Sequence, residues 1–440
     1  MTVVVRDCIH GDIELTSEEV SILDTPQMQR LRGIKQLGAA YLVYPTALHT
    51  RFDHCIGTCW LTKRILRALS CGSQSIDDYD ARVISIAALL HDVSHLPFGH
   101  TFEDERRVFD RHDSPERLVQ ALDRGELGRL LRSKRLLEPV IAILTRSTAS
   151  TVPAYGHQII SGAISADLAD YLKRDAVFCG LSPSYDERVF RYLELDSSRG
   201  LVFRVGRNGD VREDALSEII NLLRMRYFLS ERVYYHHTKV AAGAMISKAV
   251  EVALFEGRIS LEKLACSDDW LLINELRTSN FALAEQLAEM IRYRRLYKRC
   301  YVLHRDAESL DSGAFEDVVS HLSALYHFDA DRRSRAESEL CRNSGLKDGQ
   351  LIIYCPSPDM QLKEADVPIA GLREAESLKD VTARNSELQV LMASHRRLWR
   401  FYVFISPEAL EKAQAVAKAC EEYFGFKNAY MPRQYKPCSG

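Results

Sequence analysis

The 440-residue sequence lacks the features that mark several specialised classes of protein. No apolar run approaches the ~20 residues that a membrane-spanning helix needs, and the N-terminus turns polar too early for a signal peptide. The eleven cysteines form no C-x-x-C pair, which argues against a zinc ribbon or a disulfide framework. The chain shows neither a sequence repeat nor a low-complexity stretch. We therefore expect a globular, cytoplasmic protein without a membrane partner.

The sequence also lacks an excess of positive charge. It holds 58 Lys and Arg residues against 61 Asp and Glu residues, for a formal net charge of −3. A surface that binds nucleic acid usually carries more basic residues, so we expect no nucleic-acid partner. Any anion that the protein binds should therefore be held by a local site.

Helical periodicity dominates the first three hundred residues. Alternation around Gly11 predicts a short N-terminal hairpin over 3–15, and apolar residues recur at helical spacing over 51–69. The nearly all-apolar stretch 81–90 predicts a helix buried on every side. Further helices are expected over 26–37, 114–122, 134–146, 158–179, 215–230, 231–256, 261–265 and 283–293, and a strand over 200–205 that a Gly-Asp turn at 209–210 ends.

The pattern changes near residue 330. Strand signals at 350–355 and 399–405 alternate there with helical stretches at 333–343 and 407–424. We predict a mainly α protein, in which a large helical domain over 1–300 is followed, over 301–440, by a connecting segment and a smaller α+β lobe.

Histidines cluster in one short part of the chain. Six of the fourteen lie between residues 49 and 112, and the adjacent pair His91-Asp92 ends the buried helix 81–90. Such a pair is costly to bury unpaired, and a metal ion would satisfy both groups. His54 on the preceding helix and Asp167 on a later one complete a mixed set of nitrogen and oxygen ligands. Any one of these residues alone is better explained as a core histidine or a helix cap, but the joint pattern favours a metal site.

In this order, His54…His91-Asp92…Asp167, the residues resemble the H…HD…D motif of the HD phosphohydrolase superfamily. The sequence is most similar to its deoxynucleoside triphosphate triphosphohydrolase branch, including animal members that join the HD domain to a sterile-alpha-motif domain, which is not found here. The resembling stretches are 9–11, 24–32, 34–38, 49–54, 91–100, 170–175, 226–237 and 363–366.

The resemblance implies an HD helical core around residues 50–180. It also implies metal-dependent hydrolysis of a nucleotide. A divalent metal (Mn, Fe, Mg, Co, Ni or Zn) held by the four motif residues would activate water, which attacks the α-phosphate of a deoxynucleoside triphosphate (dNTP) and releases deoxynucleoside and triphosphate. His100 would protonate the departing 5′-oxygen, and Glu103 would orient His112 at the α-phosphate. His95 and Arg51 would contact phosphate oxygens.

The resemblance also implies a substrate pocket. Gln36 and Asp175 would hold the sugar 3′-hydroxyl, Leu37 and Tyr171 would pack beneath C2′, and Arg226 and Tyr234 would lie beside the sugar and phosphates. Without the likeness, a tyrosine-rich helix stripe is more often core than ligand contact.

Regulation and assembly are implied in the same way. An activating nucleotide would bind at Asp24, Gln29 and Arg32, although Val3 stands where that site has a basic residue. The likeness further implies a homo-oligomer, either a dimer or a tetramer.

One departure bears on the substrate, and two other functions stay open. Relatives often have a phosphate-binding Lys directly after the motif aspartate, where this chain has Leu168. The alternatives are an HD phosphohydrolase of another nucleotide phosphoester (monophosphate, cyclic or modified) and a non-catalytic nucleotide sensor. The sugar-pocket residues favour dNTPs, and the complete set of metal and histidine residues disfavours a sensor. Balance of the dNTP pool and antiviral depletion of DNA precursors would use identical chemistry.

Overall fold

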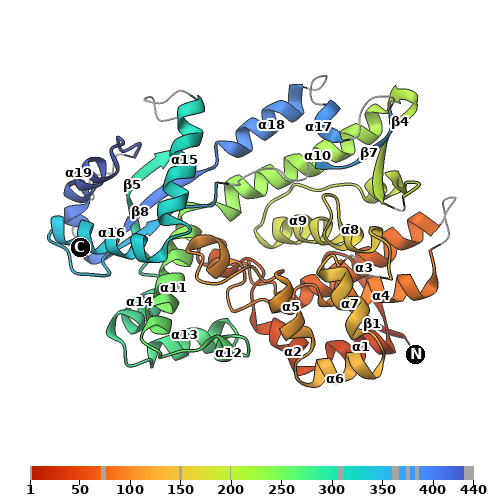
Figure 1. Cartoon of the computed structure of the whole chain (residues 1–440), viewed down its shortest axis with the longest axis horizontal. Coiled ribbons are helices and arrows are strands. Elements are labelled where there is room, and N and C mark those ends of the chain that lie inside the picture. Colours follow the sequence, from red (N-terminus) through yellow and green to blue (C-terminus); the bar gives the residue numbers. More distant parts are fainter. Residues whose placement is uncertain are drawn as a thin grey trace.

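The computed structural model describes residues 2–70, 76–147, 151–198, 200–304, 312–358, 366–372, 377–381 and 386–430. Most of these residues are helical, and their strands form three small sheets (Figure 1). The predicted mainly α fold is therefore confirmed. In this described part of the chain, no helix is both long and apolar enough to cross a membrane. Most of the resembling stretch 363–366 lies outside the described residues.

The predicted N-terminal hairpin is present. β1 (Thr2–Asp7) pairs antiparallel with β2 (Gly11–Thr16) and leads into α1 (Ser17–Leu23). The Thr16 hydroxyl accepts a hydrogen bond from the Glu19 N–H, and the Glu19 carboxylate accepts one from the Thr16 N–H. This reciprocal capping stabilises the start of α1.

The helix expected over 26–37 is shorter than predicted. α2 (Pro26–Gln29) passes into a 3₁₀ turn, η1 (Arg30–Gly33), after which the chain is extended. There the Arg51 N–H donates to the Ile34 carbonyl, and the Gln36 N–H donates to a carbonyl of the neighbouring segment before α3. These long-range bonds replace helical ones and hold Gln36 beside the start of α3. A second 3₁₀ turn, η2 (Gly38–Leu42), follows.

Helices α3, α4 and α9 form the centre of the HD region, where α3 packs against both of the others. The helices here are α3 (Arg51–Ser70), α4 (Asp78–Leu90), α5 (Pro115–Leu122), α6 (Gly125–Ser133), α7 (Leu137–Leu144), α8 (Tyr155–Ser161) and α9 (Ala166–Phe178). Helix α6 was not predicted.

The single helix predicted over 158–179 is in fact two, α8 and α9. Gly162 is extended at the end of α8, and the Ser165 hydroxyl caps α9 by accepting from the Leu168 N–H. The break therefore places Asp167 in the first turn of α9, at the edge of a pocket.

A three-stranded sheet joins distant parts of the chain. Its strands are β3 (Leu193–Leu195), β4 (Leu201–Val211) and β7 (Ile369–Leu372), in the order β3-β4-β7. β4 continues through the turn expected at 209–210, with left-handed backbone at Asn208 and Gly209 and a shift in its pairing with β7. Because β7 pairs parallel with β4, a segment from beyond residue 301 completes a sheet that begins before residue 200.

The helices between β4 and β5 connect the β3-β4-β7 sheet to the C-terminal lobe. They are α10 (Glu213–Leu229), the π-helical turn η5 (Ser230–Tyr234), α11 (His237–Phe255), α12 (Leu261–Leu264), α13 (Asp269–Arg277) and α14 (Ala282–Arg292). The helix predicted over 231–256 is interrupted, because His236 is extended and its ring caps α11 by accepting from the Thr238 N–H.

The C-terminal lobe is built on an antiparallel sheet in the order β5-β8-β6. β6 and β8 confirm the two predicted strands, and β5 was not predicted. The elements of the lobe and of the segment that returns to β4 are β5 (Lys298–His304), α15 (Ser312–Tyr326), α16 (Ala330–Asn343), β6 (Leu351–Tyr354), α17 (Leu378–Val381), α18 (Ser386–Arg396), β8 (Arg400–Ile405), η8 (Pro407–Lys412) and α19 (Ala413–Phe424).

Both faces of the β5-β8-β6 sheet are covered, and successive residues of each strand point to opposite faces. Ile352, Tyr402 and Phe404 pack toward α11 and α14, in a core that also contains Phe102 of the HD region. Ile353 and Val403 face the other way, into a core shared with α15, α16 and α19. The lobe is thus continuous with the HD region through a shared core, and the division of the chain at residue 300 stays a prediction.

The contact between α3 and α9 supplies a test of this packing. A Cβ added at Gly57 would lie 1.9 Å from Asp170 Oδ1 and 2.5 Å from Arg174 Nη2. Alanine gains at most about 1 kcal/mol of helix propensity over glycine, whereas forcing atoms into a packed interior costs about 1–3 kcal/mol or more. We expect Gly57→Ala to lower the free energy of unfolding by about 2 kcal/mol in urea denaturation. Ser70→Ala, at the exposed end of α3, is the control. Equal stability of the two variants would contradict the close contact.

Candidate metal centre

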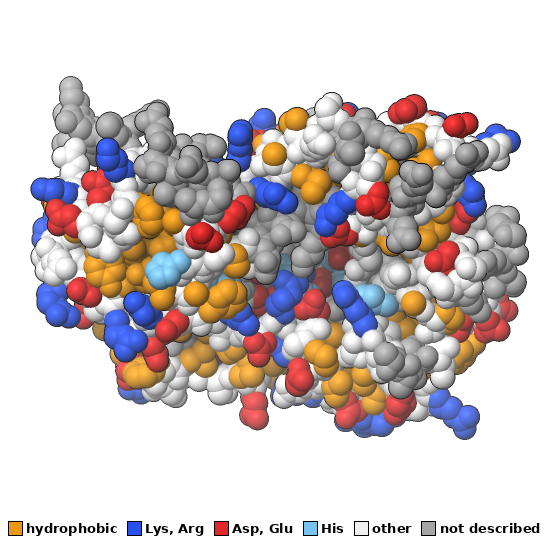
Figure 2. Space-filling model, turned by 45° about the horizontal axis from the view of Figure 1, so that its top comes forward, with side chains coloured by type: hydrophobic (Ala, Val, Ile, Leu, Met, Phe, Trp, Pro, Cys, Tyr) orange, Lys and Arg blue, Asp and Glu red, His pale blue; other side chains and the backbone are white. Residues whose placement is uncertain are grey.

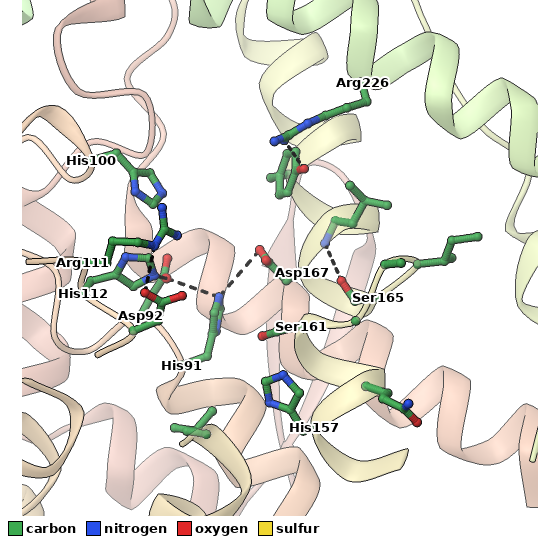
Figure 3. Close-up of a pocket in the computed structure, with 18 of the residues that line it drawn as sticks. His91, Asp92, His100, Arg111, His112, His157, Ser161, Ser165, Asp167 and Arg226 are labelled. Carbon is green, nitrogen blue, oxygen red and sulfur yellow. Dashed lines mark hydrogen bonds and ion pairs between the residues drawn. The ribbon is translucent and has the colours of Figure 1, made fainter. Parts of the chain in front are cut away.

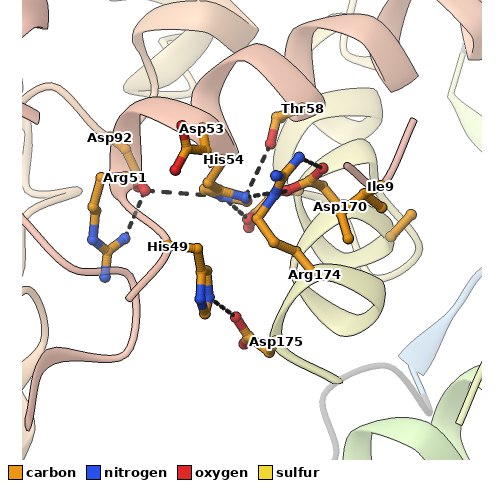
Figure 4. A network of polar contacts seen from close by, with 12 residues as sticks. Ile9, His49, Arg51, Asp53, His54, Thr58, Asp92, Asp170, Arg174 and Asp175 are labelled. Carbon is orange, nitrogen blue, oxygen red and sulfur yellow. Dashed lines mark hydrogen bonds and ion pairs between the residues drawn. The ribbon is translucent and has the colours of Figure 1, made fainter. Parts of the chain in front are cut away.

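The four predicted metal ligands converge from three helices. His54 comes from α3, His91 and Asp92 follow the last turn of α4, and Asp167 lies in the first turn of α9 (Figures 3 and 4). His54 Nε2 is 3.2 Å from His91 Nε2 and 3.0 Å from Asp167 Oδ1. Asp92 completes the group, with Oδ1 3.4 Å from His91 Nε2 and Oδ2 3.9 Å from His54 Nε2.

Hydrogen bonds on the far side of each imidazole ring fix which nitrogen faces the group. His91 Nδ1 lies 2.7 Å from the Ala88 carbonyl oxygen, which can only accept, so Nδ1 carries the proton. His54 Nδ1 lies 2.7 Å from Asp170 Oδ2, which gives it the same tautomer. In the neutral form of each ring, Nε2 therefore presents a lone pair toward Asp92 and Asp167.

This arrangement fits a divalent cation. Two lone pairs and two carboxylates that face one point repel each other unless positive charge lies between them. Burial lowers the pKa of His54, but the carboxylates of Asp167 and Asp170 outweigh burial and raise that pKa to about 10. Burial raises the pKa of Asp167, but His54 and His91 outweigh burial and hold that pKa well below its usual range. The site thus attracts positive charge, and two imidazoles with two carboxylates suit a transition metal.

Asp170 supports the centre without facing it. Besides His54, its carboxylate accepts hydrogen bonds from Arg174 Nε and Nη2, each at 2.9 Å (Figure 4). It also accepts one from His10 Nε2 at 2.7 Å. Arg174 in turn binds Asp7 at 2.9 Å. Sequence reasoning missed the supporting roles of Asp170 and His10. The three-residue spacing from Asp167 to Asp170 on one helix was the available signal for the first, and the resembling stretch 9–11 was the signal for the second.

Arg51 lies at the centre in a buried ion pair. Its Nη1 donates to Asp92 Oδ2 at 2.6 Å, and its side chain is 2% exposed. The guanidinium lies against Gly99, where a Cβ would be 2.6 Å from Arg51 Nη2. Arg51 would therefore make its predicted contact with phosphate while it is bound to Asp92, a predicted metal ligand.

The predicted histidine cluster forms around a single carboxylate. Glu103 Oε2 lies 3.0 Å from His100 Nδ1 and 3.1 Å from His112 Nδ1, and Arg117 donates to the other oxygen at 3.2 Å. Burial raises the pKa of Glu103, but the two histidines outweigh it and hold that pKa well below its usual range.

His100 and His95 differ in the exposure of their side chains. The His100 side chain is 40% exposed and reaches into the pocket (Figure 3). His95 is fully buried, stacks on His112 with ring centroids 3.7 Å apart, and approaches Asp92 at 3.2 Å from behind. His95 does not line the pocket, and its predicted contact with phosphate stays a prediction.

A pocket of about 1640 Å³ joins the metal centre to the predicted substrate residues. Its opening is visible in Figure 2 as a hollow with charged and histidine side chains around it. The predicted residues that line it are Gln36, Leu37, Arg51, His91, Asp92, His100, His112, Asp167, Tyr171, Asp175, Arg226 and Tyr234.

The predicted sugar contacts are held together by hydrogen bonds. Asp175 accepts from Tyr234 through Oδ2 and pairs with His49 Nε2 through Oδ1, both at 2.8 Å. Arg226 donates to the Tyr171 hydroxyl and lies over the rings of Tyr171 and Tyr234. Sequence reasoning had not assigned His49 to the site. Its position two residues before Arg51 was the signal.

The predicted regulatory residues lie together, and outside this pocket. Arg32 Nε donates to Gln29 Oε1 at 2.9 Å, and its guanidinium lies 3.7 Å from the centroid of the Phe52 ring. Asp24 is exposed at the end of α1. Binding of a nucleotide at Asp24, Gln29 and Arg32 stays a prediction.

Comparison with known proteins identifies the class to which the fold and the site belong. The HD domain family matches residues 51–175, and the HD associated region matches residues 211–434, which is half of the chain. The chain belongs to the HD-domain superfamily of phosphohydrolases. HD domains bind divalent metals, in agreement with the convergent ligands described above.

Similar proteins are known from archaea and animals. "Uncharacterized protein MJ1154" of Methanocaldococcus jannaschii is 29% identical over 414 residues, which cover 93% of this chain and 80% of that protein. Deoxynucleoside triphosphate triphosphohydrolase SAMHD1 of Danio rerio is 28% identical over 345 residues, covering 67% of this chain and 55% of that protein. SAMHD1 of Homo sapiens is 27% identical, covering 56% and 44%. The chain thus spans about half the length of these SAMHD1 relatives.

Two solved structures share the fold over nearly the whole chain. A hypothetical protein from Aquifex aeolicus has a TM-score of 0.68 at 21% identity and covers 94% of this chain and 100% of its own. A phosphohydrolase from Bacteroides thetaiotaomicron has a TM-score of 0.66 at 20% identity and covers 92% and 99%. At these identities the likeness shows the fold alone.

We expect Asp167→Ala to lose bound metal. The side chain of Asp167 is 31% exposed, so its removal should disturb the fold less than removal of the buried Asp92, which would leave Arg51 without its carboxylate. Metal per chain, measured by elemental analysis after dialysis, should fall well below the wild-type value. Ser161→Ala, on the same side of the pocket (Figure 3), is the control and should retain metal. Wild-type metal content in the Asp167 variant would show that the ligand set is wrong.

Proposed function

We propose that this protein is a metal-dependent deoxynucleoside triphosphate triphosphohydrolase that releases deoxynucleoside and triphosphate. One observation carries the proposal: a single pocket is lined by three of the four predicted metal ligands and by the residues expected around a dNTP, with the exception of the buried His95. The likeness to SAMHD1, whose name states this activity, supports the same choice.

The chemistry divides between an ion and the chain's own residues. A divalent ion held by His54, His91, Asp92 and Asp167 would polarise a phosphate and lower the pKa of water. His100 is the proposed acid, because it reaches the pocket and its Nδ1 is held by Glu103. A carboxylate on one ring nitrogen stabilises the imidazolium, which can then deliver a proton from the other nitrogen to the departing 5′-oxygen.

Sugar selection is assigned to the wall formed by α9 and η5. Asp175, fixed by Tyr234 and His49, can accept a hydrogen bond from a 3′-hydroxyl. Leu37 and Tyr171 line the same pocket, where a 2′-hydroxyl would meet apolar surface. Exclusion of a hydroxyl by shape discriminates by about 10²-fold, so ribonucleotides should be poor substrates and not inert ones.

A second function, hydrolysis of another nucleotide phosphoester, is favoured by one observation. Leu168 lines the pocket and is 4% exposed, at the position where the family resemblance places a phosphate-binding lysine. Five Lys and Arg side chains line the pocket, and three of them are bound to carboxylates: Arg51 to Asp92, Arg111 to Asp113 and Lys239 to Glu105. A pocket with fewer free cations binds a triphosphate less tightly and could accept a monophosphate or a cyclic nucleotide.

Product analysis decides between these functions. Purified protein is incubated with each dNTP and NTP in the presence of Mn²⁺, Mg²⁺, Fe²⁺ or Co²⁺, and products are separated by chromatography. We expect deoxynucleoside and intact triphosphate, with dNTPs preferred over NTPs. Diphosphate or monophosphate products, or turnover confined to other phosphoesters, would favour the second function. Binding of nucleotide without turnover under every metal would indicate a sensor.

The assignment of His100 has its own test. We expect His100→Asn to lower kcat by about 10²–10⁴-fold with a small change in KM, because general acid catalysis contributes this much and acts in the transition state. His321→Asn, an exposed histidine of α15, is the control and should keep wild-type kinetics. Unchanged kcat in His100→Asn would move the acid role to another residue, with His112 as the next choice.

A further inference from the structure

A cluster of buried charges lies next to the proposed acid. Arg106 directly follows the π-helical turn η3 (Thr101–Glu105), and its side chain is 0% exposed. Its guanidinium donates to Glu337 Oε1 at 2.5 Å and to Glu251 Oε2 at 2.6 Å, and also to the Ile353 carbonyl at 3.1 Å. One arginine of the HD region is therefore bound to α11, α16 and β6.

The same lobe also holds the backbone of Arg106. Arg333 of α16 donates to the Arg106 carbonyl at 2.9 Å and to Glu251 Oε1 at 2.8 Å. Glu337 is itself fixed, since it accepts from the Ile353 N–H at 2.8 Å and from Lys248 at 2.9 Å. The segment at residue 106 is thus held at both its side chain and its main chain by the C-terminal lobe.

Stability alone is a poor explanation for this cluster. Burying each ion costs several kcal/mol before its partners compensate, and a well-packed apolar cluster of similar volume often stabilises a fold equally well. Charged groups with several hydrogen bonds instead impose a defined geometry, since each bond has a preferred distance and angle. The cluster therefore fixes position more than it adds stability.

The position that it fixes is that of the proposed acid group. Glu103 lies three residues before Arg106, in the turn η3, and its carboxylate aligns His100 and His112. The lobe also borders the pocket directly, because Tyr354 at the end of β6 and Pro356 line it. A shift of β6 or α16 would therefore reach both the acid group and the pocket wall.

We infer that Arg106 and Glu337 are positioning residues, through which the C-terminal lobe sets the placement of Glu103 and hence of His100 and His112. This inference rests on the proposed function, because it assigns these histidines to that reaction. Neither residue lines the pocket, so they act through η3 and not by contact with substrate.

The test compares two buried glutamates in the full-length protein. Glu337→Gln keeps the shape of the side chain and removes its charge, which leaves Arg106 with Glu251 as its one remaining carboxylate. Glu19→Gln is the matched control, because Glu19 is 3% exposed against 4% for Glu337 and likewise binds a lysine and a backbone N–H. Activity, bound metal and hydrogen–deuterium exchange of the peptide 100–112 are measured for each.

We expect kcat of Glu337→Gln to fall by about 10–100-fold with KM nearly unchanged, since a displacement of about 1 Å at a reacting group has effects of this size. Exchange within 100–112 should become faster, while bound metal stays at the wild-type level because the metal ligands lie on other segments. Glu19→Gln should match the wild type in all three. Arg106→Lys, which keeps the charge and loses the planar fork, should show the same pattern and serves if Glu337→Gln does not fold.

The outcomes separate this inference from the proposed function. Wild-type kcat and wild-type exchange in folded Glu337→Gln or Arg106→Lys would overturn the inference, even if the wild type hydrolyses dNTPs. A general loss of metal and of protection across the chain would also overturn it, because the cluster would then be merely structural. If the wild type releases no triphosphate, the proposed function fails, and the exchange of 100–112 still shows whether the lobe positions the segment.

Discussion

The carboxylate of Asp170 is the point on which the HD region depends. It binds His54 of α3, His10 after the first strand of the hairpin, and Arg174 one turn further along α9. Because the proton on His54 Nδ1 is held there, the lone pair of Nε2 must face the other metal ligands. The absence of a side chain at Gly57 lets α3 approach closely enough for this contact. The ligand geometry is therefore a property of the packing of three segments, and the ligands alone do not determine it.

The four metal ligands could be predicted from the sequence, but the hydrogen bonds that orient them could not. His91 and Asp92 end an apolar helix, which marks them as buried polar groups that need a partner, and the order of the motif extends that signal to His54 and Asp167. Asp170 and Arg174 also lie in a recognisable stretch, but their partners His10 and Asp7 are far away in the chain. Contacts of that kind depend on tertiary packing, which no local spacing encodes.

Several elements were mispredicted for reasons that are visible in the structure. Local propensity over 158–179 and 231–256 favours continuous helices, yet both are interrupted close to residues that line the pocket, Asp167 and Tyr235. The strand β5 was missed because it follows a run of basic residues and alternates poorly, since both of its faces are buried. In each case tertiary packing overrode the local signal.

The parallel pairing of β4 with β7 has a consequence for the synthesis of the protein. A ribosome releases β4 long before β7, and chains fold as their segments emerge. During that interval one edge of β4 has no strand beside it and exposes unpaired N–H and C=O groups, which can pair with other chains. The nascent chain therefore carries an unprotected strand edge until residues 369–372 have been synthesised.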